Sequence, residues 1–203
     1  NMKKLIIILL SLPIFLIGQN DTLIKNKAYE SLYSFKYKNP LHVKYILYHG
    51  GGDCNRSQFT FKVDNIKNMA NPSEYAHTGM DLGHLVNAED FAYDCELMAL
   101  TFKMYNCLPQ TARLNRGIWK SYESKIRKLS QTDSLLVICG GIFIDRQLPN
   151  SKVFVPTYCW KVVKLLKTGK IIYSLLFTNE VETNSVKHIP LEQLEKKIGY
   201  KLF

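Results

Sequence analysis

The distribution of apolar residues along the chain predicts a set of β-strands. Residues 135–144 (LLVICGGIFI) form a nearly continuous apolar run, which is typical of a central strand buried on both faces. Residues 153–167 and 170–178 are interpreted as two long strands that flank the turn Thr168-Gly169-Lys170. Two shorter strands are expected at residues 43–48 (VKYILY) and at residues 58–63 (QFTFKV), where polar and apolar positions alternate. Residues 20–39 are polar and aromatic and are expected to be a lead-in without strands.

The clearest helical pattern covers residues 115–129. At 100° per residue, five apolar side chains of this segment fall within one arc of about 100°, and Asn115 projects into the same arc. Glu123 lies at the edge of that arc, with Arg116 and Arg127 just outside it. Residues 190–198 (PLEQLEKKI) also have helical spacing, with Pro190 near the start and a glycine as the stop, and residues 89–103 are compatible with a short helix. Together the patterns predict an α+β fold: a central, mainly antiparallel sheet with flanking helices, the helix at 115–129 against it, and a hairpin at one edge.

The N-terminus has the pattern of an export signal. Lys3 and Lys4 precede an apolar run at residues 5–17, which is followed by Gly18 and Gln19. The run is shorter than the roughly 20 residues that span a bilayer, so a membrane anchor or a buried helix is the weaker interpretation. We therefore expect residues 1–19 to be a signal and the protein to be exported, either to the periplasm or out of the cell, with no stable membrane anchor after signal removal.

Length and charge narrow the class of partner. The chain has 203 residues, of which 46% are hydrophobic and 22% charged, and this suits one globular domain with a sizeable core. The formal net charge of +10 favours an acidic partner, such as nucleic acid, an anionic membrane surface or a polyanionic sugar. The alternative is that the excess charge only keeps the protein soluble.

The cysteines indicate a disulfide rather than a metal site. There are five, so at least one stays unpaired if the others bridge within the chain, and none has the CxxC spacing of a zinc site. Cys139 and Cys159 lie in apolar strand-like runs, where buried free thiols are usual. The bridge favoured from the sequence is Cys95–Cys107.

Residues 75–123 concentrate the side chains that can perform chemistry. Asp81, His84, Asn106, Asn115 and Glu123 stand there between apolar and aromatic residues. Each has an ordinary structural alternative: a lone histidine is often part of the core, and an asparagine at the start of a helix is often only an N-cap. Asparagine is also costly to bury unpaired, and on spacing alone the structural and functional interpretations both stay open.

Three motifs in this stretch resemble those of the DNA/RNA non-specific endonucleases, the ββα-metal nucleases. The family has a DRGH segment, then Asn-x-x-Pro-Gln, then Asn-x-Gly-x-Trp leading to a glutamate. Here the segments are DLGH at residues 81–84, NCLPQ at residues 106–110 and NRGIWKSYE at residues 115–123, with matching spacing. Flanking segments are also similar and extend the resemblance over nearly all of the chain after the signal: 40–47, 56–64, VICGGIF at 137–143, Val155-Pro156-Thr157 with Lys161, and 190–203. The resemblance implies a single nuclease domain at residues 20–203 with the ββα-metal fold.

The resemblance also implies a role for each candidate residue. His84 would be the general base that activates water, for which an imidazole is suited at neutral pH. Asn115 would be the single protein ligand of Mg²⁺, with Mn²⁺ as an acceptable substitute, and a hard ion that keeps most of its waters fits such a site. Glu123, eight residues further along and about 12 Å away by helical rise, would hold a metal-bound water. Asn106 would help to fix the site and Asp81 would support the hairpin. DNA and RNA would be bound through phosphate contacts.

One departure from the family pattern bears on activity. The arginine of DRGH, which is expected to contact the scissile phosphate, is Leu82 here, and Asn87 replaces the proline that usually follows the motif. Loss of one such contact commonly lowers the rate by about 10²–10³. Arg56, Arg113 or Arg127 is then expected to supply the cation, although Arg127 has an i,i+4 salt bridge to Glu123 as its structural alternative. Two hypotheses follow: an exported, Mg²⁺-dependent nuclease of DNA and RNA, or a catalytically weak or inactive nucleic-acid or polyanion-binding protein on the same scaffold.

Overall fold

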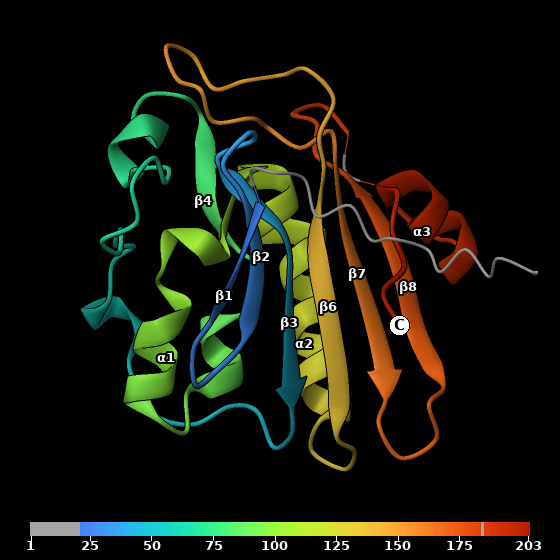
Figure 1. Cartoon of the computed structure of the whole chain (residues 1–203). Coiled ribbons are helices and arrows are strands. Elements are labelled where there is room, and N and C mark those ends of the chain that lie inside the picture. The colour runs from blue at the N-terminus through green and yellow to red at the C-terminus, as the bar shows by residue number, and fades with distance from the viewer. Residues whose placement is uncertain (1–20, 184) are drawn as a thin grey trace, which may run out of the picture.

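The fold is built on one antiparallel sheet whose middle strands are buried on both faces. The computed structural model describes residues 21–183 and 185–203, so the expected signal at residues 1–19 lies outside the described residues. The seven strands follow the order β1 (Asp21–Lys25), β2 (Glu30–Ser34), β3 (Asn39–Leu47), β6 (Leu135–Ile142), β7 (Tyr158–Leu165), β8 (Ile171–Thr178) and β9 (Val186–His188) (Figure 1). Every neighbouring pair is antiparallel. The predicted central strand is confirmed as β6, between β3 and β7.

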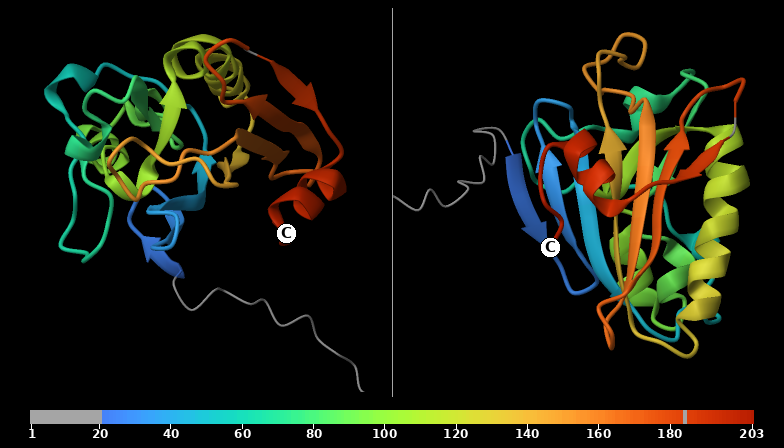
Figure 2. Two further views of the ribbon diagram at one scale, coloured as in Figure 1. Left: turned by 90° about the horizontal axis from the view of Figure 1, so that it is seen from above. Right: turned by 90° about the vertical axis from the view of Figure 1, so that its right-hand side faces the viewer.

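The two faces of the sheet carry separate groups of apolar side chains. On one face Val163, Leu175 and Phe177 pack with the helix α2 (Lys120–Leu129) and with a second, two-stranded sheet formed by β4 (Met80–His84) and β5 (Cys107–Thr111). On the other face Trp160 and Leu176 pack with Leu194 of helix α3 (Leu191–Ile198). Figure 2 shows α2 and α3 on opposite sides of the sheet. The α+β expectation is therefore confirmed.

The helix predicted at residues 115–129 is present but is kinked. It consists of a π-helical segment η5 (Leu114–Trp119) and of α2, with non-helical backbone angles at Gly117 (φ −104°, ψ −110°). The predicted inward face is confirmed, because Trp119, Tyr122 and Ile126 are buried. The helix at the C-terminal end is α3, and Gly199 ends it in the left-handed conformation (φ 84°), as expected for a glycine stop.

Four expectations about the other elements are wrong. Residues 20–39 are not a lead-in, since β1 and β2 pair there and bury Tyr33. Residues 58–63 form no strand: Phe59 and Phe61 pack on Phe102 from a loop, and the isolated bridge Lys62–Lys103 is the pairing found there. The strand predicted from residue 153 begins only at Tyr158. The hairpin is not at an edge of the main sheet, because β4 and β5 form a sheet of their own.

The remaining helices are short and lie in the connections. The segment at residues 89–103 contains the short helix α1 (Cys95–Thr101), and single helical turns are found at η1 (Arg56–Gln58), η2 (Pro72–Tyr75), η3 (Ala88–Phe91) and η4 (Met104–Asn106). Within residues 21–183 and 185–203, no helix has the length and apolar content required to span a membrane.

Candidate active site

A polar cleft of about 360 Å³ lies where β4, η3, η5 and α2 meet. Its walls bring together three of the predicted residues, His84, Asn115 and Glu123, from three different elements. The remaining residues that line it are Arg56, Leu82, Asn87, Ala88, Glu89, Arg116, Lys120, Ser124 and Arg127. Four of these side chains are cationic, so the cleft is suited to an anionic ligand.

His84 ends β4, and its ring packs against two aromatic side chains that also contact each other. The ring centroids of Phe61 and Phe102 lie 4.4 Å and 4.7 Å away. Burial, with Arg56 as a secondary influence, lowers the pKa of His84 to about 3, so the imidazole is neutral at physiological pH. Its Nε2 atom is buried and has no hydrogen-bond partner in the described part of the chain. A neutral, oriented imidazole with a nitrogen left for a ligand can accept a proton.

Asn115 is oriented by Asp81. The Asn115 Nδ2 atom donates to Asp81 Oδ2 at 2.9 Å, and Arg116 donates to the same carboxylate through Nε at 2.8 Å and Nη2 at 2.6 Å. Burial raises the pKa of Asp81, but the bonds from Arg116 and Asn115 outweigh it and hold that pKa below its usual value. Because its nitrogen is bound to Asp81, the amide of Asn115 leaves its oxygen for a ligand in the cleft.

Glu123 faces the cleft from α2. Its position at the edge of the apolar arc predicts a partly exposed side chain, but the side chain is buried. It is 6% exposed, and burial raises the pKa of its carboxyl, against a lowering influence that comes first from Lys161. The Lys161 Nζ atom lies 3.7 Å from Glu123 Oε1. The carboxylate is therefore one half of a buried ion pair at the wall of the cleft.

The structural alternative for Arg127, an i,i+4 salt bridge to Glu123, is not formed. Arg127 Nε donates instead to Asp90 Oδ1 at 2.9 Å, and Tyr45 donates to the other oxygen of Asp90. Asp90 is buried, so Arg127 is held in place while part of its guanidinium lines the cleft.

Two of the predicted residues support the site without lining the cleft. The Asn106 amide is fully used by the backbone: it donates to the carbonyls of Val86 and Thr101 and accepts from Val86 N–H. It thus holds the segment that follows His84. Asp81 contacts Asn115, as described above, and the role of hairpin support that the resemblance implied for it stays a prediction.

Gly83 and Asn87 show how the motif residues are fitted to their surroundings. Gly83 lies against the side chain of Gln110, and a Cβ atom at Gly83 would come within 2.2 Å of Gln110 Oε1. Asn87, which replaces the usual proline, caps η3 by accepting from Glu89 N–H. It lines the cleft, and its side chain helps to lower the pKa of Glu123.

Two of the three arginines expected to replace the arginine at position 82 line the cleft, and the third does not. Arg56 and Arg127 line the cleft, whereas Arg113 donates to the carbonyl of Glu182 and is not among the described residues that line it. Arg116, which the helical pattern placed on the rim but which was not named as a replacement cation, also lines it, and so does Lys120, which the sequence did not indicate. Leu82 is partly buried against the core and also faces the cleft, so its position is occupied by an apolar surface.

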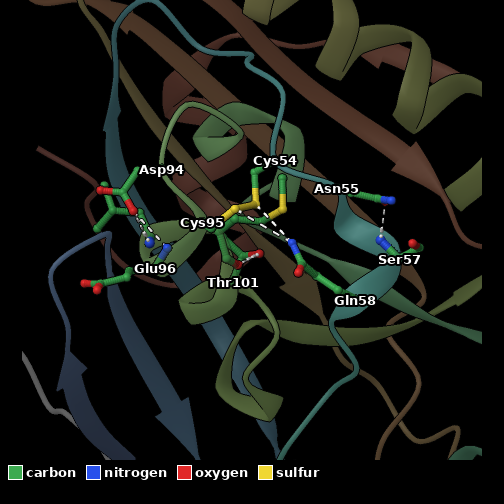
Figure 3. The surroundings of a disulfide bond; sticks show 10 residues. Cys54, Asn55, Ser57, Gln58, Asp94, Cys95, Glu96 and Thr101 are labelled. Carbon is green, nitrogen blue, oxygen red and sulfur yellow. Dashed lines mark hydrogen bonds between the residues drawn. A yellow bond between two sulfur atoms is a disulfide. The ribbon is translucent and has the colours of Figure 1, made fainter.

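The disulfide is Cys54–Cys95, so the expected Cys95–Cys107 bridge is wrong. Cys107 sits in β5 as a buried free thiol, as do Cys139 and Cys159 in the main sheet. Figure 3 shows the bridge between the loop of Cys54 and the start of α1, with Gln58 beside it. This bridge ties down the loop that carries Arg56.

The residues present fit a hard divalent ion better than a transition-metal site. Within the part of the chain that the structure describes, there is no group of three or more His, Cys, Asp or Glu side chains placed to hold a metal. An amide oxygen freed by the Asp81 contact, with the Glu123 carboxylate on the same cleft, is the oxygen-only arrangement that Mg²⁺ accepts together with its waters.

Asp90 and Lys161 are further functional candidates that the sequence pattern did not reveal. Asp90 lies in a mixed acidic and apolar segment, and Lys161 is one of two lysines, with Lys164, in an otherwise apolar and aromatic strand. The sequence did contain one signal for Lys161, namely a lysine within a segment that was predicted to be a strand. Its partner could not be identified, because Glu123 lies on a different element.

Comparisons with known proteins identify the family of the chain. Residues 12–203 match the sequence model of the family described as DNA/RNA non-specific endonuclease. Mitochondrial endonuclease G of Bos taurus is 29% identical over 170 residues, covering 73% of this chain and 57% of the relative. A nuclease of a Nostoc species is 29% identical over 143 residues, covering 64% of this chain and 52% of the relative. The chain thus spans about half the length of these relatives.

A solved structure shows the same fold. The crystal structure of the EndoG/EndoGI complex, whose title concerns the mechanism of EndoG inhibition, superimposes with a TM-score of 0.75 at 22% identity. The match covers 87% of this chain and 83% of that one.

Proposed function

Because this chain belongs to the DNA/RNA non-specific endonuclease family, we propose that it is a Mg²⁺-dependent endonuclease that hydrolyses phosphodiester bonds in both DNA and RNA. The observation that carries the proposal is the convergence of His84, Asn115 and Glu123 on one cationic cleft. These side chains come from β4, η5 and α2, and packing alone does not require all three to face the same space.

In the proposed reaction His84 accepts the proton of the attacking water, since its lowered pKa keeps the ring neutral and Phe61 and Phe102 fix its plane. Asn115 and Glu123 would hold the ion, the first directly and the second through water. A bound Mg²⁺ would supply charge stabilisation to the phosphate and the departing 3′ oxygen. Asp81 keeps the Asn115 oxygen turned to the cleft, and Mn²⁺ is expected to substitute for Mg²⁺.

Substrate binding would rely on phosphate contacts from the cations of the cleft. Arg56, Arg116, Lys120 and Arg127 line it, and no aromatic side chain is among the described residues that do so. Contacts of this kind carry little sequence information, which supports action on many sequences. Affinity should then fall steeply as the salt concentration rises.

A cleavage assay tests the proposal. Supercoiled plasmid and a structured RNA are incubated at low salt with Mg²⁺ or with EDTA, using the wild-type protein and the H84A variant. Metal-dependent cleavage of both substrates that is lost in H84A is expected. If the wild-type protein leaves both substrates intact, the proposal fails.

The second candidate function is a nucleic-acid or polyanion-binding protein with little or no activity. The observation that favours it is the apolar Leu82 at a wall of the cleft where the family has an arginine. Under this alternative the wild-type protein binds DNA in EDTA without cleaving it, and L82R gains cleavage. Cleavage by the wild-type protein that depends on His84 excludes it.

We also propose that the protein is exported. The basic and apolar pattern at residues 1–19 supports this, and so does the Cys54–Cys95 disulfide, because such bridges persist mainly in oxidising compartments. The test is cell fractionation of the full chain and of a variant in which Ile7 and Leu9 are changed to Asp. Retention of the wild-type chain in the cytoplasm would contradict export.

A further inference from the structure

Lys161 is a charged side chain in the interior of the main sheet. It lies in the middle of β7, which is paired on both sides with β6 and β8, and it is 1% exposed. Its neighbours on the same face of the strand, Cys159 and Val163, are fully buried in the apolar core. Fully buried lysines are rare, because an ammonium group loses its hydration there.

The partners of Lys161 belong to the wall of the cleft. Its Nζ atom lies 3.7 Å from Glu123 Oε1 and 4.1 Å from the centre of the Trp119 ring. Lys161 does not itself line the cleft among the described residues, and its burial keeps it out of reach of a substrate. Of the residues that line the cleft, Glu123 is the one with which Lys161 forms an ion pair, so an effect of Lys161 on the reaction is expected to act through Glu123.

Glu123 at the wall of the cleft and Asp90, which is buried behind Arg127, each form a salt bridge with one cation. Asp90 is held by Arg127 at 2.9 Å, and Glu123 has Lys161. If Lys161 were removed, Glu123 would stand near Asp90 with only Arg127 to balance both charges. A buried ion pair is weak evidence for stability, since well-packed apolar replacements are often neutral or stabilising. Packing alone would thus be served as well by a methionine at position 161.

We propose that Lys161 is the positioning residue of Glu123, whose carboxylate it holds in place at the wall of the cleft from the sheet side. The inference rests on the proposed function, because that function gives the Glu123 carboxylate its task of holding water around the metal ion.

The electrostatics of the site agree with the geometry. Burial raises the pKa of Glu123, and Lys161 is the strongest influence that lowers it. The titratable and charged groups that face Glu123 are Asp90 from η3, Arg127 from α2, Lys161 from β7, Cys139 from β6 and Tyr45 from β3. Without Lys161 the carboxyl group should remain protonated to a higher pH, and the reaction should then require a higher pH.

The first test compares K161M with the wild-type protein in plasmid cleavage at saturating Mg²⁺ between pH 5 and pH 9.5. We expect kcat at pH 7 to fall by about tenfold or more and its acid limb to move up by about one pH unit or more, since one unit corresponds to a tenfold change. K164M is the matched control: it makes the same change on the same strand, where Lys164 lies over the ring of Phe203, and should keep the wild-type profile. Should K161M be too unstable to assay, K161Q carries the same test.

A double variant shows whether Lys161 acts through Glu123. In the E123Q background, adding K161M should cause no further loss of kcat, because the carboxylate that Lys161 serves is already gone. A multiplicative further loss, or a K161M profile identical to that of the wild-type protein, would overturn the proposal.

A measurement that needs no activity separates this inference from the proposed function. In protein labelled with ¹³C at glutamate carboxyl carbons, the Glu123 signal is assigned by its loss in E123Q and followed with pH. We expect its titration midpoint to lie higher in K161M than in the wild-type protein and to be unchanged in K164M. If the wild-type protein cleaves nothing but this shift is seen, the proposed function fails and the role of Lys161 stands. Equal midpoints in K161M and the wild-type protein refute the role.

Discussion

The Cys54–Cys95 disulfide should contribute strongly to stability and moderately to activity. It joins residues that are 41 positions apart and links the Arg56 loop to the start of α1. Replacing both cysteines by serine (C54S/C95S) leaves three cysteines, all buried, so no exposed thiol is created.

The size of the effect follows from the closed loop. For a separation of 41 residues, the loop-entropy relation gives a stabilisation of about 4 kcal/mol at 25 °C. In a chain of this length 1 kcal/mol shifts the melting temperature by roughly 2–4 °C, so the double variant should melt roughly 8–16 °C lower. The effect on cleavage is smaller, because the loop stays attached through the bonds from Cys54 N–H to the Ala92 carbonyl and from Lys62 N–H to the Phe102 carbonyl. If the contact from Arg56 is lost, kcat/KM should fall by about tenfold.

The assays are urea and thermal unfolding by circular dichroism, with plasmid cleavage at a temperature where both proteins are folded. Wild-type protein treated with dithiothreitol should behave as the double variant does, and the double variant should not respond to the reductant. A melting temperature within about 3 °C of the wild type would refute the reasoning. It would mean that the unfolded chain is already restricted between residues 54 and 95.

Four further outcomes are expected. H84A should retain its far-UV circular dichroism and lose about 10²–10⁴ in kcat, because the general base is gone; a loss under about fivefold would contradict that role. N115A should need at least about tenfold more Mg²⁺ for half-maximal cleavage and should bind Mn²⁺ more weakly by calorimetry; unchanged binding would place the ion elsewhere. R116A should lower kcat/KM by about tenfold and flatten its salt dependence, as loss of one charged phosphate contact requires, whereas R113A should change neither. Burial, and after it Lys44, lowers the pKa of His42 to about 4, and the pKa of His84 is also below the ordinary value of 6.5. Between pH 6.5 and pH 4 the unfolded chain therefore binds more protons than the folded chain. The free energy of unfolding should fall as the pH drops from 6.5 toward 4, and it should fall less steeply in H42Q.

Elements with strong local patterns could be predicted from the sequence. The apolar run that became β6, the turn between β7 and β8, and the inward face of α2 each depend on side chains within one segment. The strand expected at residues 58–63 shows the limit of such patterns. Its alternating aromatics pack on Phe102 from a loop, and an alternating pattern is the same whether a partner strand is present or not.

Part of the candidate site could likewise be predicted from the sequence. Motif spacing was sufficient to select His84, Asn115 and Glu123, and all three line the cleft. The family itself was recognisable from those motifs and their flanks, and the match over residues 12–203 confirms it. The predicted roles of the individual residues and the export signal stay predictions.

What the sequence determined by itself is therefore the set of residues that can perform the chemistry and the segments that carry them. The tertiary structure alone decided which groups stand beside them: Asp81 against Asn115, Lys161 beneath Glu123, and Cys54 rather than Cys107 as the partner of Cys95. Helical and strand periodicity act over a few residues and leave a clear trace in the sequence. Contacts between distant segments depend on how the sheet, the β4–β5 pair and the helices stack, and no single segment encodes that arrangement.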